Sequence, residues 1–135
     1  MSKPPQSPPP TQRRSNAGKQ AEAAGRAAER LVAARLTLEG WLVIGERVRT
    51  VAGEIDLIAT REGMLLLAEV KSRLNHEQAS YALAPRQRRR LIAAATWIIA
   101  EHPEWGSAGV RFDVFLVDRN SAIAQIADAI RDDGI

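Results

Sequence analysis

Two neighbouring stretches of the sequence decide the fold: GEIDLIA at residues 53–59 and LLLAEVK at residues 65–71. Both are rich in the apolar residues that form buried strands, and the Thr-Arg-Glu-Gly segment between them predicts a hairpin turn. Each stretch nevertheless carries charge, with Asp56 in the first and Glu69 and Lys71 in the second. Ionised groups are costly to bury unless they pair or hold a metal, so these charges indicate a functional site.

Helices are predicted on both sides of this hairpin in the sequence. Residues 21–39 are strong helix formers with Ala and Leu at helical spacing, and Pro85 suits the first turn of a second helix running to about Glu101. Further strands are expected at residues 41–44, 47–51, 110–117 and 122–127. With the two short segments at 41–44 and 47–51 counted together, the order α-β-β-β-α-β-β predicts an α/β domain in which helices flank a mixed central sheet.

The first 20 residues differ from the rest of the chain in composition. They hold five of the seven prolines and no aromatic or β-branched aliphatic residue, so we predict a disordered basic tail followed by a single domain at 21–135. The first 21 residues carry four basic side chains and no acidic one, which leaves 15 basic and 16 acidic groups beyond them. The isoelectric point near 9.9 therefore reflects the tail, and the domain's total charge gives no support for nucleic-acid binding.

Several protein classes are excluded by what the sequence lacks. There is no cysteine, so disulfides, thiolate nucleophiles and cysteine-based zinc sites are excluded. The longest apolar run, residues 91–100, is too short to span a bilayer, and no apolar segment follows the arginine pair near the N-terminus as a signal peptide would require. We therefore expect a cytoplasmic protein with no membrane association.

The spacing of Asp56, Glu69 and Lys71 predicts a metal-dependent hydrolytic site. Glu69 and Lys71 point the same way along one strand, and a hairpin turning near residue 62 brings Asp56 opposite Glu69. Two carboxylates suit Mg²⁺ or Mn²⁺, which polarises a phosphodiester and lowers the pKa of a bound water. Lys71 would orient that water or neutralise charge that develops in the transition state. The alternative is an edge strand whose Glu69 and Lys71 form a surface ion pair of little consequence.

Two further groups of charged residues each allow a structural and a functional interpretation. Four arginines crowd the start of the second predicted helix, where cations oppose the helix dipole: Arg86, Arg88, Arg89 and Arg90. They predict either a phosphate-binding surface at the helix N-terminus or a solvated face whose arginine stems cover apolar surface. Arg111 and Asp113 share one face of a strand and form either a structural ion pair or part of the cleft lining; we favour the ion pair.

Three of these segments also carry a resemblance to a known family. The runs GEIDLI at 53–58, AEVKSR at 68–73 and RFDV at 111–114 resemble the YraN-like family of small bacterial proteins, which has the restriction-endonuclease-like PD-(D/E)XK fold. The similarity covers about residues 24 to 127. This sequence departs from the family pattern at Ala28, where a glycine is usual, and at Gln87, where a lysine is usual.

The resemblance implies an αβββαβ core with Asp56, Glu69 and Lys71 in the nuclease positions. It also implies that Glu29 on the first helix supports the metal shell and that the Val70 backbone carbonyl is a metal ligand. The expected activity is a Mg²⁺- or Mn²⁺-dependent DNA endonuclease, acting on branched or damaged DNA, with a homodimer in keeping with other nucleases of this fold. The alternative is a protein that kept the fold but only binds nucleic acid or a protein partner.

Overall fold

The computed structural model describes residues 10–72 and 83–130, with side chains from residue 18 onward. The elements follow the predicted order: α1 (Pro10–Leu38), β1 (Leu42–Thr50), β2 (Gly53–Arg61), β3 (Met64–Ser72), α2 (Pro85–Glu101), the 3-10 helix η2 (Pro103–Gly106), β4 (Gly109–Val117) and β5 (Ile123–Ile126). Within these ranges no helix is long and apolar enough to cross a membrane. The loop predicted after residue 73 and the frayed end predicted after Ile130 lie largely outside the described residues.

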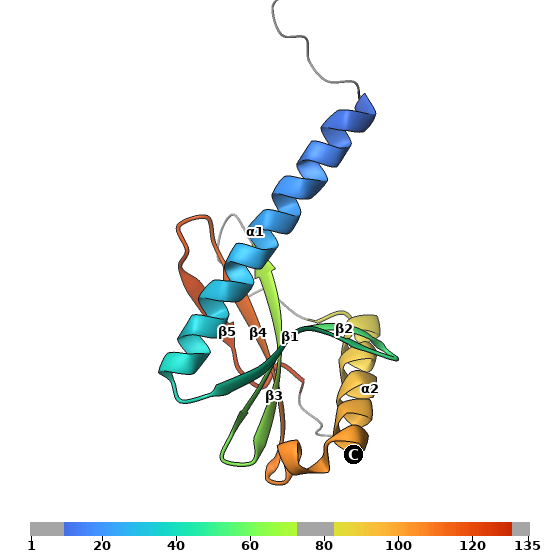
Figure 1. The fold of residues 1–135 in the computed structure, drawn as a ribbon, viewed down its shortest axis with the longest axis vertical. Coiled ribbons are helices and arrows are strands. Elements are labelled where there is room, and N and C mark those ends of the chain that lie inside the picture. Colours follow the sequence, from blue (N-terminus) through green and yellow to red (C-terminus); the bar gives the residue numbers. More distant parts are fainter. Residues whose placement is uncertain (1–9, 73–82, 131–135) are drawn as a thin grey trace, which may run out of the picture.

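The five strands form one mixed sheet in the order β1-β2-β3-β4-β5. Neighbouring strands are antiparallel except β3 and β4, which run parallel and are joined through α2. Helix α1 lies on one face of the sheet and α2 on the other (Figure 1). This arrangement, a mixed sheet flanked by two helices, confirms the predicted α/β class and agrees with a restriction-endonuclease-like core.

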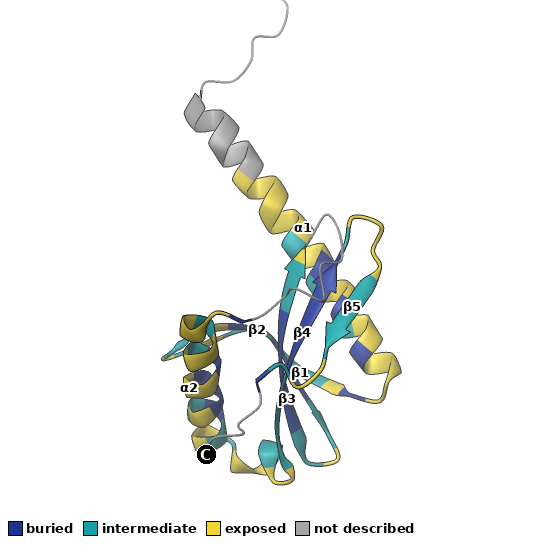
Figure 2. Ribbon diagram, turned by 180° about the vertical axis from the view of Figure 1, so that it is seen from behind, coloured by how far each residue is buried: buried dark blue, intermediate teal, exposed yellow. Residues whose placement is uncertain are grey.

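Each face of the sheet has its own hydrophobic core, because side chains alternate along the central strands. Leu65 and Leu67 of β3 pack with the inner face of α2, whereas Leu66 and Ala68 pack with α1. Strands β3 and β4 are accordingly the most deeply buried part of the sheet (Figure 2). Any charged side chain in the middle of these strands must therefore find partners within the protein.

Two boundaries differ from the prediction. Helix α1 begins at Pro10 rather than near Ala21. The expectation of a disordered N-terminal tail stays a prediction. Proline is compatible with a first helical turn, and no proline occurs again before residue 85, while Gln, Arg, Lys and Ala favour helix. Residues 1–9 lie outside the described part. The two short strands expected between Trp41 and Val51 form the single strand β1, with a register shift between Val43 and Gly45.

Candidate functional site

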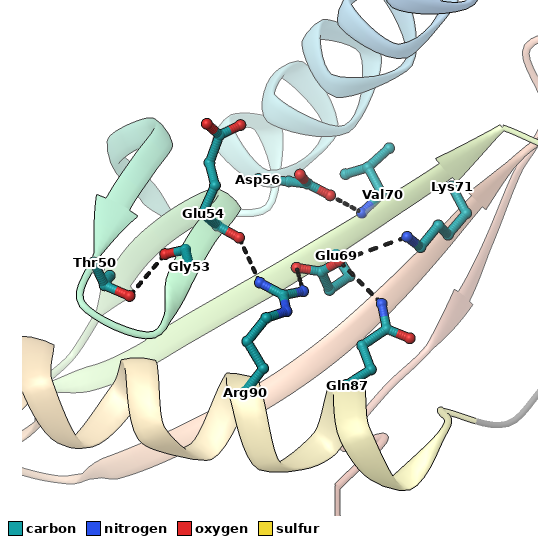
Figure 3. A network of polar contacts seen from close by, with 9 residues as sticks. All are labelled: Thr50, Gly53, Glu54, Asp56, Glu69, Val70, Lys71, Gln87 and Arg90. Atoms are coloured by element: carbon teal, nitrogen blue, oxygen red, sulfur yellow. Dashed lines mark hydrogen bonds and ion pairs between the residues drawn. The ribbon is translucent and has the colours of Figure 1, made fainter.

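The candidate site lies where the pairing of β2 with β3 ends. The ladder runs from Arg61 opposite Met64 to Leu57 opposite Ala68, and the next pair in this register would be Asp56 and Glu69. Instead of continuing the ladder, the Asp56 carboxylate accepts a hydrogen bond from the Val70 N–H, with 2.8 Å between N and Oδ2 (Figure 3). The predicted opposition of Asp56 and Glu69 would extend this register by one pair, whereas the residues that pair end at Leu57 and Ala68.

Glu69 is almost fully buried, with 3% of its surface exposed, and it faces α2. Arg90 Nη2 lies 3.2 Å from Glu69 Oε1, and Gln87 Nε2 donates to Oε2 over 3.3 Å. Lys71 Nζ lies 3.8 Å from the same Oε2, so two cations and an amide surround this carboxylate. These contacts compensate the cost of burying Glu69 in its ionised form.

Asp56 occupies a position where the regular alternation of β2 breaks. Ile55 packs in the α2-side core and Leu57 in the α1-side core, although residues two apart in a regular strand share a face. The facing strand is irregular at the same level, because Arg47 has a left-handed backbone with φ of 51°. Arg47 then reaches α1, where its Nε lies 2.9 Å from Glu29 Oε2. The sequence analysis missed Arg47, because no residue pattern marks this break.

The electrostatic environment of Asp56 opposes its ionisation. Burial, the largest cause, together with repulsion by Glu69 and Glu29, raises the pKa of the Asp56 carboxyl from 3.8 to about 6, although the Val70 N–H and Lys71 act in the opposite direction. Glu29 is a smaller contributor to this shift, and its predicted support of a metal shell stays a prediction. A bound divalent cation would relieve the repulsion between Asp56 and Glu69.

The four arginines at the start of α2 divide into two groups by the direction of their side chains. Arg90 turns inward to Glu69 and also donates from Nη1 to the Glu54 carbonyl oxygen at 2.6 Å. The side chains of Arg86, Arg88 and Arg89 are exposed in the first turns of α2, and among residues 18–72 and 83–130 no side chain caps the N-terminus of this helix. Three of the arginines are therefore on the surface, and the fourth contacts Glu69.

The donor set fits a hard divalent cation with an incomplete protein shell. Among residues 18–72 and 83–130, no three His, Asp or Glu side chains are gathered so that they alone could hold a metal ion. Mg²⁺ usually keeps several waters and takes only one or two protein carboxylates, with phosphate oxygens completing the shell. Asp56 and Glu69 are the two carboxylates of this region that could supply such ligands. The Val70 amide supports Asp56, whereas the predicted role of the Val70 carbonyl stays a prediction.

Comparison with known proteins gives a consistent family assignment. The sequence model of the uncharacterised protein family UPF0102 matches residues 28–117, which include the whole candidate site. The UPF0102 protein of Granulibacter bethesdensis is 49% identical over 114 residues, covering 84% of this chain and 72% of its own. The corresponding protein of Acidiphilium cryptum is 45% identical over 123 residues, covering 91% and 95% of the two chains. The chain therefore belongs to the uncharacterised protein family UPF0102.

Proposed function

We propose that this protein is a Mg²⁺- or Mn²⁺-dependent endonuclease that hydrolyses phosphodiester bonds in DNA. The observation that carries the proposal is the meeting of Asp56, Glu69 and Lys71 where the pairing of β2 and β3 ends. A carboxyl group whose pKa is raised by burial and by a neighbouring carboxylate is typical of functional sites. The resemblance of these segments to the restriction-endonuclease-like superfamily supports the same chemistry.

Each residue of the site has a distinct part in this chemistry. Asp56 and Glu69 would hold the cation, and a bound cation supplies Lewis-acid polarisation of the phosphate and a water of lowered pKa. Glu69 keeps the Lys71 ammonium close, so that this group can hydrogen-bond the attacking water and offset the negative charge that grows on the phosphate oxygens. Glu29, fixed by Arg47, adds negative potential that favours the cation.

The DNA backbone would be held beside this site by the start of α2. Arg86, Arg88 and Arg89 are exposed there, and the first turn of a helix presents N–H groups that favour anions. Arginine binds phosphate through two parallel donors, and such contacts fix the position of the duplex without reading its sequence. This surface supports a substrate chosen by its shape, such as branched or damaged DNA.

One observation favours a second candidate, a nuclease-fold protein that binds nucleic acid without cutting it. Glu69 already has partners on both oxygens, in Arg90, Gln87 and Lys71. A carboxylate satisfied in this way can serve a purely structural purpose. Binding alone would depend on the exposed arginines and on salt concentration, and not on Asp56 or Lys71.

The decisive experiment is cleavage of labelled single-stranded, duplex, flapped and four-way DNA with Mg²⁺ or Mn²⁺. Asp56→Asn and Lys71→Met variants are compared with the wild type, and Glu101→Gln, an exposed carboxylate at the end of α2, is the matched control. We expect metal-dependent products from the wild type and the control, and at least about a 100-fold loss in both site variants. Equal cleavage by all four proteins would contradict the endonuclease, and no cleavage with salt-dependent binding would favour the second candidate.

A further inference from the structure

Arg90 bridges two parts of the candidate site that belong to different strands. One terminal nitrogen, Nη1, donates to the Glu54 carbonyl oxygen of β2 at 2.6 Å, and the other, Nη2, lies 3.2 Å from Glu69 Oε1 of β3 (Figure 3). Its side chain is 29% exposed, whereas that of Glu69 is 4% exposed, so Arg90 is a partly exposed cation in contact with a buried carboxylate.

The stem of Arg90 is held in place by the start of β2. Gly53 has φ of 127°, a conformation that side-chain-bearing residues rarely adopt, and a Cβ at this position would lie 3.1 Å from Arg90 Cδ. The absence of a side chain at Gly53 thus leaves room for the arginine to lie against the strand. Together with the Glu54 carbonyl, this packing anchors Arg90 independently of Glu69.

We propose that Arg90 is a positioning residue that competes with the divalent cation for Glu69 and then turns to the substrate phosphate. This inference rests on the proposed function, because it assigns a second state to the same site. The guanidinium and a divalent cation repel each other, so both cannot use Glu69 Oε1 at full strength. If a cation bound Glu69, Nη2 would leave Glu69 while Nη1 kept its hydrogen bond to the Glu54 carbonyl oxygen, and the released donor would be able to bind an anionic phosphate.

The other partners of Glu69 cannot take this part. Gln87 is neutral, so it supplies a hydrogen bond but no charge that would exclude a cation. Lys71 is 3.8 Å from Glu69 and is already needed for the water and the phosphate in the proposed reaction. Arg90 alone combines a full positive charge with a second anchor that remains after Glu69 is released.

Binding of Mn²⁺ in the absence of DNA tests the competition. We compare the wild type with Arg90→Gln, which keeps an amide donor near Glu69, and with Arg89→Gln, the exposed arginine one residue earlier. Gln87→Met removes a neutral donor from Glu69, and Glu69→Gln removes the ligand itself. We expect Arg90→Gln to bind Mn²⁺ about tenfold more tightly than the wild type, and Arg89→Gln and Gln87→Met to show no such tightening.

Binding of a duplex with Ca²⁺ in place of Mn²⁺ tests the second half of the proposal. Here the order reverses: Arg90→Gln should lose about tenfold or more in affinity, well beyond the loss in Arg89→Gln. A residue that only stabilised Glu69 would not tighten metal binding and weaken DNA binding at once. The guanidinium NMR signal of Arg90 in the wild type should also shift on addition of Mg²⁺, a measurement that needs no variant.

The results separate this inference from the function on which it rests. If Glu69→Gln abolishes Mn²⁺ binding but Arg90→Gln matches the wild type, the competition is overturned and the metal site stands. The same holds if Gln87→Met tightens Mn²⁺ binding as much as Arg90→Gln, or if Mg²⁺ leaves the Arg90 signal unchanged. If Glu69→Gln binds Mn²⁺ as the wild type does, the metal site fails and the inference is overturned with it.

Discussion

Two carboxylates lie at nearly the same level of the sheet on strands separated by β3, half-buried Asp56 on β2 and buried Asp113 on β4, in different electrostatic surroundings. Asp113 of β4, opposite Ala68 of β3, accepts from Arg111 Nε and Nη2, from Gln125 Nε2 and from the Asp128 N–H, all within 3.0 Å. Asp56 accepts a hydrogen bond from the Val70 N–H, and its pKa is raised, first by burial and then by the nearby Glu69 carboxylate. Burial of a charge is therefore not in itself a sign of function; a carboxyl group whose pKa is raised by burial and by a like charge is the more informative signal.

The Asp113 cluster also explains why its arginine takes no part in the candidate site. Arg111 forms a bidentate pair with Asp113 and lies over the Trp41 ring, with Cζ 5.4 Å from the ring centroid. Its guanidinium is thus engaged on its edge and on its face. The prediction of a structural ion pair at these two positions is confirmed.

The largest expected effect is a loss of stability that occurs when Asp113 is replaced but not when Asp56 is replaced. Asp113→Asn removes the charge that compensates Arg111 in a nearly dry environment, where Asp113 is 1% exposed. We expect this substitution to lower the free energy of unfolding by about 3 kcal/mol, measured by urea denaturation at pH 7.5. Asp56→Asn, which replaces an acid of similar size, is the control and should not destabilise the fold. Equal losses in the two variants would erase the contrast drawn between the two clusters.

The next largest expected effect is the stabilisation of the folded protein by a bound divalent cation. In 100-fold excess over its dissociation constant, Mn²⁺ that binds only the folded protein raises the free energy of unfolding by about 2.7 kcal/mol. We expect this gain in the wild type and in Asp113→Asn, and its absence in Glu69→Gln, as followed by thermal unfolding with and without chelator. A gain that survives in Glu69→Gln would place the cation elsewhere on the protein.

The smallest expected effect is a pH dependence confined to Asp56. Its pKa in the folded protein is about 6 against an ordinary 3.8, so the folded state binds the proton more readily between these values. Stability from this group is therefore highest below about pH 4, falls as the pH rises to 6, and stays reduced above that. Solvent screening of this partly exposed carboxyl limits the penalty to about 1 kcal/mol.

Asp56→Asn removes that penalty and retains an acceptor for the Val70 N–H. In metal-free buffer the variant should be about 1 kcal/mol more stable than the wild type at pH 7.5 and equal to it at pH 4, by urea denaturation at both pH values. Glu101→Gln serves as the exposed control. An advantage of the same size at both pH values would mean that packing, and not charge repulsion, accounts for it.

Much of the fold and part of the site could be predicted from the sequence. Apolar periodicity and turn residues predicted the order of elements, the limits of α2 and the hairpin of β2 and β3, whose turn ends at Gly63. Counting residues back from that turn was enough to place Asp56 across from Glu69. The number of residues from a tight turn fixes which positions face each other, so this step needs no tertiary information.

The remainder depended on packing that no local pattern reveals. The alternation of side chains between the two faces of β2 breaks at Asp56. At the same level of the neighbouring strand β1, Arg47 has a left-handed backbone, so the two irregularities occur together. The inward turn of Arg90 was missed for a different reason. The buried face of α2 includes Leu91, Ala94 and Ile98. Extended by one turn toward the N-terminus, this face includes Gln87 and borders on Arg90. That signal was present in the sequence, but the arginines were treated as one cluster.

The parallel pairing of β3 with β4 has a consequence for the order in which the protein folds. Strands β1, β2 and β3 are joined by tight turns, whereas Met64 of β3 pairs with Gly109, 45 positions later. Local hairpins close quickly, and distant strands meet only after a larger loss of chain entropy. We expect the three-stranded meander to form first, so that Asp56, Glu69 and Lys71 are assembled in water and become enclosed only when α2 and β4 dock.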